Sequence, residues 1–135
     1  MTTTTTLAAD TIDDYSMWTA YVVAALCTLP LSPKEVKTFN TAERVPALAP
    51  ETEDAMRSDC KRFVAENAEV LATSGLTAVE IGTALWQSRN RLSRDGFEAR
   101  NAGEAGPFLA AKAHDFGKIQ LFIGADSALH LRQMQ

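Results

Sequence analysis

The hydrophobic positions along the chain divide it into helical stretches, followed by one alternating stretch near its end. Between Thr11 and Leu29 apolar residues recur at spacings of three and four, the period that predicts one buried face of a helix. The predicted stripe consists of Tyr15, Trp18, Val22, Ala25, Leu26 and Leu29. Pro30 and Pro33 end this first helix, because proline lacks an amide hydrogen and its ring clashes with the preceding turn.

A second helix is predicted from Pro50 to Gly75. Proline is favourable in the first turn of a helix, and glycine supplies the left-handed conformation that ends many helices. The predicted inner stripe consists of Met56, Cys60, Phe63, Val64, Asn67 and Leu71. Residues 30–50, which precede this helix, are rich in proline and have no sustained period. They predict a long surface connection with a short helical turn around residues 34–38.

The segment “GLTAVEIGTALW” contains a helix start that is defined by side chains. Thr77 is the predicted N-cap, and Glu80 three residues later completes a capping box, in which each side chain bonds the backbone amide of the other residue. Both residues are therefore expected to be structural. The third helix should begin at Thr77 and run to about Leu92, before a turn at residues 95–96.

The C-terminal third predicts a short helix and then a β-hairpin. Pro107 begins the helix and Gly117 ends it. The alternation in “KIQLFIGADSALHLRQ” predicts two strands joined by a Gly-Ala-Asp-Ser turn. A lone hairpin is marginal in water, so one face should pack on the helices. The predicted fold class is α+β, mainly helical with three to four helices and a C-terminal β-hairpin packed on them.

Length and charge limit the classes of protein to which the chain can belong. With 135 residues, 46% of them hydrophobic, it has the size of one domain. The polar opening “MTTTTTLAAD” predicts a disordered tail over residues 1–10, followed by a single domain over residues 11–135. A net charge of −4 disfavours general nucleic-acid binding. The apolar run from Met17 to Leu29 is too short to cross a bilayer, so a cytoplasmic protein without membrane contact is expected.

Residues that commonly carry chemistry are sparse. Cys27 and Cys60 lie far apart with no CxxC spacing, which predicts two buried thiols and neither a zinc site nor a disulfide. His114 and His130 come with no catalytic motif, and the sequence has no glycine-rich phosphate loop. We therefore expect a protein that is not an enzyme and that uses no cofactor or metal.

The segment “WQSRNRLSRDGFEARN” holds the first group of candidate contact residues. Trp86, Arg89 and Asn90 fall within about one helical turn, where Arg89 and Asn90 could hold a carboxylate or phosphate beside an aromatic wall. The alternative is that Trp86 belongs to the core while Arg89 and Asn90 bridge the following loop. A candidate basic patch consists of Arg89, Arg91, Arg94 and Arg100. The alternative for this patch is a solvated face, partly paired with interleaved acids.

Acidic residues at the first two predicted helix starts form the second group. They are Asp13 and Asp14 in the first helix, and Glu51, Glu53 and Asp54 in the second. These positions complement the positive end of a helix dipole, which is the structural interpretation. The functional alternative is an acidic surface that mimics nucleic acid and occupies a basic groove on a host protein.

Three segments, “LWQSRN”, “DGF” and “FGKIQLFIGADS”, together resemble a widespread family of small proteins encoded by tailed bacteriophages and prophages. In that family a helix ends in Trp-x-x-Arg-Asn, a Gly-Phe pair follows, and a short helix precedes a strand-turn-strand ending. The resemblance covers residues 12–131, and its sharpest matches are Asp59, Cys60, Phe63, Asn67, Trp86, Arg89, Asn90, Gly96, Phe97, Leu109, Phe116, Gly117 and the hairpin. It implies a phage or mobile-element origin and a small α+β domain. Trp86 and Phe97 are expected to be structural.

This chain departs from the family pattern in two places. Family members usually carry Gly-His-Gly before the Gly-Phe pair, where this chain has “RLSRDGF”. Their hairpin turn is usually Asp-Asp-Gly, where this chain has “GADS”. Any role of a histidine before the Gly-Phe pair is therefore expected to be absent here, and the family implies no reaction.

The predicted function is that of a non-enzymatic phage or mobile-element accessory protein that binds and inhibits a host macromolecule. Its most concrete form is an inhibitor of a host defence complex, of the anti-CRISPR type, and the expected partner is a host protein or protein complex. One alternative is a nucleic-acid-binding regulator with a helix-turn-helix-like region, although direct nucleic-acid binding is less favoured. Another is a phage structural or assembly component. A homodimer formed through the exposed side of the hairpin is a further alternative.

Overall fold

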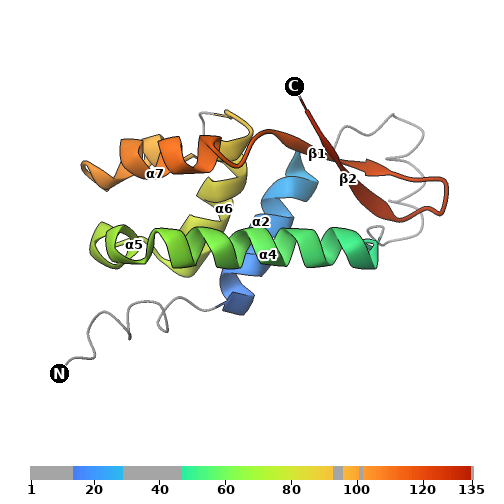
Figure 1. Ribbon diagram of the computed structural model, residues 1–135, viewed down its shortest axis with the longest axis horizontal. Helices are drawn as coiled ribbons and strands as arrows, with labels where there is room; N and C mark the ends of the chain where they lie inside the picture. The colour runs from blue at the N-terminus through green and yellow to red at the C-terminus, as the bar shows by residue number, and fades with distance from the viewer. Residues whose placement is uncertain (1–13, 29–46, 93–95, 101, 135) are drawn as a thin grey trace.

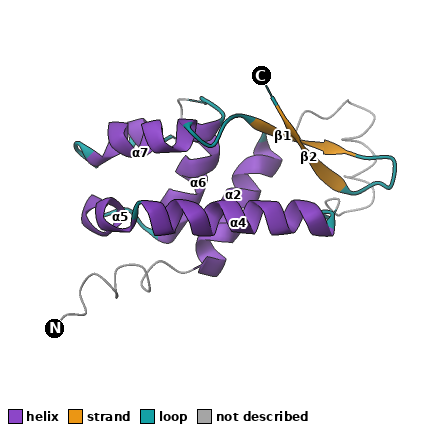
Figure 2. Cartoon of the chain, in the orientation of Figure 1, coloured by secondary structure: helices purple, strands orange, loops and turns teal. Residues whose placement is uncertain are grey.

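The computed structural model describes residues 14–28, 47–92, 96–100 and 102–134, which form helices and one hairpin (Figure 1). The elements are α2 (Asp14–Cys27), α4 (Pro50–Glu66), α5 (Ala68–Ser74), α6 (Ala78–Arg89), the 3-10 turn η1 (Phe97–Ala99), α7 (Ala105–His114), β1 (Ile119–Ile123) and β2 (Leu129–Gln133). Helices make up most of the molecule and the two strands lie at one end (Figure 2). The predicted α+β class is confirmed. The predicted tail over residues 1–10 and the helical turn around residues 34–38 lie outside the described residues.

The second predicted helix is divided in two at Asn67, so the prediction of one continuous helix is wrong. Asn67 leaves the helical conformation, with φ −126° and ψ 23°. Its buried side chain donates from Nδ2 to the carbonyl oxygen of Phe63 at 2.9 Å. Asparagine can bond nearby backbone groups in place of the helical ladder, which explains the break. The predicted start at Pro50 is confirmed, and α5 ends as predicted at Gly75, which has φ 78°.

The capping box at the start of α6 is confirmed. The amide of Glu80 donates to Thr77 Oγ1 at 3.2 Å, and the amide of Thr77 donates to Glu80 Oε1 at 2.9 Å. The helix ends at Arg89, three residues earlier than predicted, because Arg91 adopts a left-handed φ of 58°. The amide of Leu92 then bonds the carbonyl of Gln87 at 2.7 Å, which completes a Schellman motif. Residues 90–92 therefore provide no second, reading helix for a helix-turn-helix.

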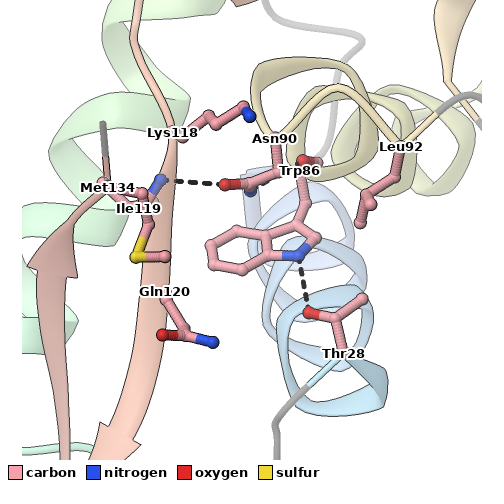
Figure 3. Close-up of a pocket in the computed structure, with 8 residues that line it drawn as sticks. All are labelled: Thr28, Trp86, Asn90, Leu92, Lys118, Ile119, Gln120 and Met134. Atoms are coloured by element: carbon pink, nitrogen blue, oxygen red, sulfur yellow. Dashed lines mark hydrogen bonds between the residues drawn. The ribbon is translucent and has the colours of Figure 1, made fainter.

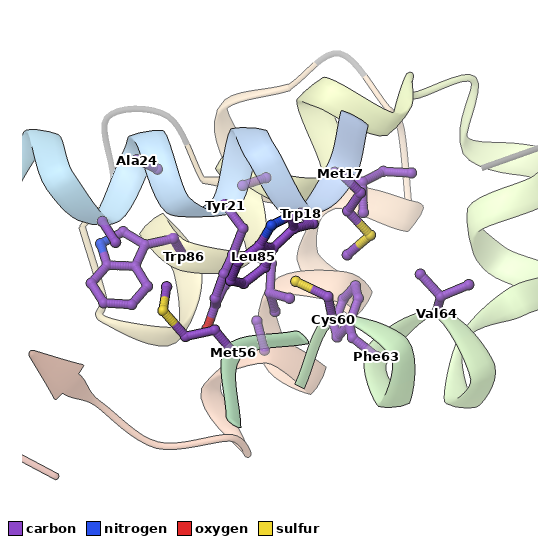
Figure 4. Packing of buried hydrophobic residues seen from close by; sticks show 14 of the residues in the cluster. Met17, Trp18, Tyr21, Ala24, Met56, Cys60, Phe63, Val64, Leu85 and Trp86 are labelled. Carbon is purple, nitrogen blue, oxygen red and sulfur yellow. The ribbon is translucent and has the colours of Figure 1, made fainter. Parts of the chain in front are cut away.

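The core lies where α2 packs on α6 and both face α4. Figure 4 shows Met17, Trp18 and Tyr21 of α2 directed toward α4 and α6. The predicted stripe on the first helix is partly wrong, because Tyr15 is 70% exposed whereas Met17 and Tyr21 are fully buried. The helix is apolar on nearly all sides, so its own sequence does not single out one inner face. Gly82 of α6 allows the close packing, since a Cβ there would overlap the carbonyl oxygen of Met17.

The hairpin packs its inner face on the helices, as predicted. Strands β1 and β2 are antiparallel, with Leu121 opposite Leu131 and Ile123 opposite Leu129. Leu121 and Leu129 are buried in the core. Leu129 also forms a short parallel bridge with the segment before α4, since its amide bonds the carbonyl of Ala47 at 2.9 Å. The hairpin is therefore attached both to the core and to the start of α4.

The Gly-Phe pair begins the turn η1 that joins α6 to α7. Phe97 is fully buried, and its ring stacks on that of Phe63 with centroids 5.4 Å apart. Its backbone amide donates a hydrogen bond to Ser88 Oγ at 2.9 Å. The structural role predicted for Phe97 is confirmed. Helix α7 begins at Ala105, two residues before the predicted start at Pro107.

Candidate functional site

The side chain of Arg89 joins four elements of the fold. Its Nη1 donates to Asp59 Oδ2 at 2.7 Å and to the hydroxyl of Tyr21 at 3.0 Å. The opposite edge of the guanidinium donates to two backbone carbonyls after α7, those of Phe116 and Gly117, each at 2.8 Å. Arg89 is only 3% exposed. Acceptors from α2, α4 and the segment after α7 bond the donors of Arg89, which favours a structural role for this residue. Contact of Arg89 with a partner stays a prediction.

Burial around Arg89 keeps two neighbouring groups protonated. Loss of solvent raises the pKa of the Tyr21 hydroxyl well above its ordinary value, although the positive charge of Arg89 opposes this effect. Burial also raises the pKa of the Cys60 thiol, to about 12, with a further contribution from the carboxylate of Asp59. A thiolate is the reactive form of cysteine, so Cys60 is inert at neutral pH. The predicted burial of Cys60 is confirmed, whereas Cys27 is exposed and that prediction is wrong.

Asn90 and Trp86 also have structural partners. Asn90 Oδ1 accepts a hydrogen bond from the amide of Ile119 at 2.8 Å, and Asn90 Nδ2 donates to the carbonyl of Trp86 at 2.9 Å. The indole nitrogen of Trp86 donates to Thr28 Oγ1 at 3.0 Å (Figure 3). Asn90 thus fixes the start of β1 to the end of α6, and Trp86 fixes the end of α2 to α6. The structural alternative for Arg89 and Asn90 was a bridge to the following loop. Their bridges instead reach Phe116, Gly117 and Ile119, which follow α7.

A shallow pocket of about 270 Å³ lies between the indole of Trp86 and the first strand (Figure 3). Its lining residues are Thr28, Trp86, Asn90, Leu92, Lys118, Ile119, Gln120 and Met134. The polar groups of Thr28, Trp86 and Asn90 are bonded within the protein, which leaves Lys118 and Gln120 to meet a ligand. Small-molecule sites usually enclose about 300–1,000 Å³. The volume of this pocket is slightly below that range.

The described acidic candidates do not form one surface. Asp14, the first residue of α2, lies close enough to Cys60 for its charge to raise the pKa of that thiol. Cys60 is ten residues after the start of α4. Glu51, Glu53 and Asp54 precede Cys60 by nine, seven and six residues, which places them about 9–14 Å from it along the helix axis. The start of α4 instead lies beside the hairpin (Figure 1). Glu53 is paired with Arg57 at 3.1 Å. Asp13 lies outside the described residues.

The described arginines do not share one patch either. Arg89 is buried, Arg91 is exposed just after α6, and Arg100 lies 3.8 Å from Glu80 at the start of α6. The two ends of this helix are about 16 Å apart, at 1.5 Å per residue. A continuous basic surface through these three residues is therefore excluded. Arg94 lies outside the described residues.

An apolar groove between α2 and α6 was missed by the sequence analysis. We define the α2–α6 groove by its lining residues Tyr15, Ser16, Thr19, Ala20, Val23, Val79 and Thr83. Val23 is 50% exposed and Val79 is 54% exposed. The groove has no charged lining residue, and Asp14 precedes it on α2. The signal in the sequence was that α2 carries apolar residues on all its sides, more than one face can bury.

The described histidines and acids form no cluster of metal ligands. His130 meets Asp126 at 2.9 Å, but this pair lies on the surface of the hairpin. In the part of the chain that the structure covers, no group of three His, Cys, Asp or Glu side chains is placed to hold a metal ion. No helix among the described residues has the length and hydropathy needed to cross a membrane.

No protein-family model, curated protein or solved structure matches the chain. The resemblance to small phage proteins therefore stays a prediction drawn from the segments quoted above.

Proposed function

We propose that this chain is a non-enzymatic accessory protein of phage type, which binds a host protein through the α2–α6 groove. The observation that carries the proposal is the apolar lining of this groove, in which large side chains from two helices remain exposed. Exposed apolar surface of this kind on a soluble domain marks an interaction site. The inhibition of a host defence complex, of the anti-CRISPR type, is the most concrete form of the proposal.

The shape and charge of the groove define the partner's chemistry. Two helices packed side by side leave a channel that can receive a third helix, the arrangement used when an amphipathic helix docks in a groove. Val23 and Val79 supply apolar contacts from the two walls. Asp14 stands at one end of the channel. The expected partner segment is an apolar helix with a basic residue where it passes Asp14.

A pull-down of the tagged chain from nuclease-treated host lysate, followed by mass spectrometry, tests this proposal. Val79→Asp should abolish capture of the partner, and Asp14→Lys should weaken it. Val79 is the second residue of α6, where an acidic side chain favours the helix, so the variant should remain folded. Phe108→Asp on α7 is the matched control, because Phe108 is 44% exposed and lies outside the groove.

Equal capture by the wild type, Val79→Asp and Phe108→Asp would contradict the proposal. Inhibition of a host defence complex leads to a second expected result. Expression of the chain in a host with an active defence complex should raise phage plating, and Val79→Asp should remove this gain. Plating that does not change with wild-type chain would contradict inhibition of that complex even if a partner were captured.

A further inference from the structure

The hairpin presents one face to the core and a different set of side chains to the outside. Ile119, Leu121 and Leu129 point inward and are buried. Strand residues alternate between faces, so the intervening positions form the outer face. We define this hairpin face by Lys118, Gln120, Phe122, His130, Arg132 and Met134. In the register, Phe122 is opposite His130 and Gln120 is opposite Arg132.

Three planar groups are held in a row on the hairpin face. The guanidinium of Arg132 lies 4.4 Å from the ring centre of Phe122. The ring of Phe122 lies 5.7 Å from that of His130, at an interplanar angle of 33°. Asp126 holds the imidazole from the far side through a contact of 2.9 Å to Nε2. Gly124 leaves room for this placement, since a Cβ at that position would overlap the His130 ring.

The hairpin face is basic within an acidic chain. The chain has a net charge of −4, but the six residues of this face include Lys118 and Arg132, and the adjoining carboxylate of Asp126 is bonded to His130. Within the described part of the chain, neither cation forms a salt bridge. By contrast, Arg57 and Arg62 on α4 are each paired with a glutamate one turn away. The local charge is therefore available for an anionic partner.

The face continues into the pocket beside Trp86. Lys118, Gln120 and Met134 line that pocket together with the indole (Figure 3). Phe122 lies four positions after Lys118, a span of about 13 Å along the strand. This length suits about two or three stacked bases, the number that the aromatic side chains of a small RNA-binding sheet accept. The side-chain amide of Gln120 lies between Lys118 and Phe122 along the strand.

We propose that the hairpin face binds single-stranded nucleic acid. Bases stack on the outer side of the Arg132–Phe122 pair and against His130, and a base edge meets the amide of Gln120. Lys118 and Arg132 neutralise two neighbouring phosphates. Every base has a flat face, so this arrangement accepts any base sequence. Recognition of a duplex instead needs an element that enters one of its grooves. The proposal uses no residue of the α2–α6 groove, so its test is independent of the host-protein proposal.

Fluorescence anisotropy of the full chain with labelled oligothymidylate and oligouridylate tests this proposal. With two phosphate contacts, the logarithm of the binding constant should fall with that of salt concentration at a slope of about −1.4. Phe122→Leu combined with Arg132→Gln should weaken binding by about tenfold or more, since base stacking on aromatic groups is lost. Lys118→Gln alone should make the slope shallower by about 0.7.

The matched control is Phe108→Leu combined with Lys112→Gln on α7. These residues form the same kind of pair, with Lys112 Nζ 5.3 Å from the ring centre of Phe108, away from the hairpin. The control should bind like the wild type, and circular dichroism should show that both double variants are folded. Absence of binding at low salt would overturn the proposal. Equal loss of binding in the two double variants would also overturn it. Competition by polyglutamate as strong as that by the oligonucleotides would do the same, since the face would then recognise acidic protein.

Discussion

Replacement of Arg89 by methionine tests whether the buried guanidinium holds the helices together. Methionine keeps the length of the aliphatic part and removes the four hydrogen bonds that Arg89 donates to Tyr21, Asp59, Phe116 and Gly117. Removal of one partner from a buried ion pair costs about 3–5 kcal/mol. The carboxylate of Asp59 is 25% exposed and regains some water, so the lower end applies, about 3 kcal/mol.

Urea titration followed by tryptophan fluorescence measures this change in the free energy of unfolding. A domain of this size is stable by about 5–15 kcal/mol, so the midpoint should fall clearly while the slope stays constant. Arg89→Lys keeps the charge but not the planar set of donors, and should lose an intermediate amount. Glu66→Gln, which removes an exposed pair with Arg62 at 3.9 Å, should change stability by less than about 0.5 kcal/mol.

A loss below about 1 kcal/mol for Arg89→Met would refute this reasoning. It would mean that the cost of burying the charged guanidinium cancels its four hydrogen bonds. Arg89 would then contribute specificity of packing rather than stability.

Four further predictions concern the packing, the backbone and the two thiols. Gly82→Ala should destabilise the protein by about 2–3 kcal/mol or more in the same urea assay, because the new Cβ overlaps the backbone of Met17; wild-type stability would contradict the close packing of α2 on α6. Arg91→Gly should stabilise the protein by about 1 kcal/mol, since glycine adopts the left-handed φ of 58° without strain. A loss of stability would show that contacts of the Arg91 side chain outweigh its backbone strain. A thiol reagent at neutral pH should modify Cys27 rapidly and Cys60 only on unfolding. Burial raises the pKa of Cys60 from 9.0 to about 12, so the thiol loses its proton at lower pH in the unfolded state than in the folded state. The free energy of unfolding should therefore fall as the pH rises from about 9 toward 12. Cys60→Ala should reduce this fall.

The features that depend only on neighbouring residues could be predicted from the sequence. The capping box of Thr77 and Glu80, the start of α4 at Pro50 and the stop at Gly75 were predicted and are present. The alternation that gave the hairpin is equally local. These signals act through backbone hydrogen bonds and allowed backbone angles over a few residues, so no knowledge of the rest of the fold is needed.

The side of each element that is buried, and the residues that remain to meet a partner, depend instead on how distant segments pack together. Helix α2 is apolar on nearly all sides, and the close approach at Gly82 selected its inner face and left the α2–α6 groove outside. Arg89 looked like a surface ligand, but its acceptors lie between 27 and 68 residues away along the chain. Such contacts form only when distant segments pack, because an arginine finds its partner through space and not through spacing in the sequence.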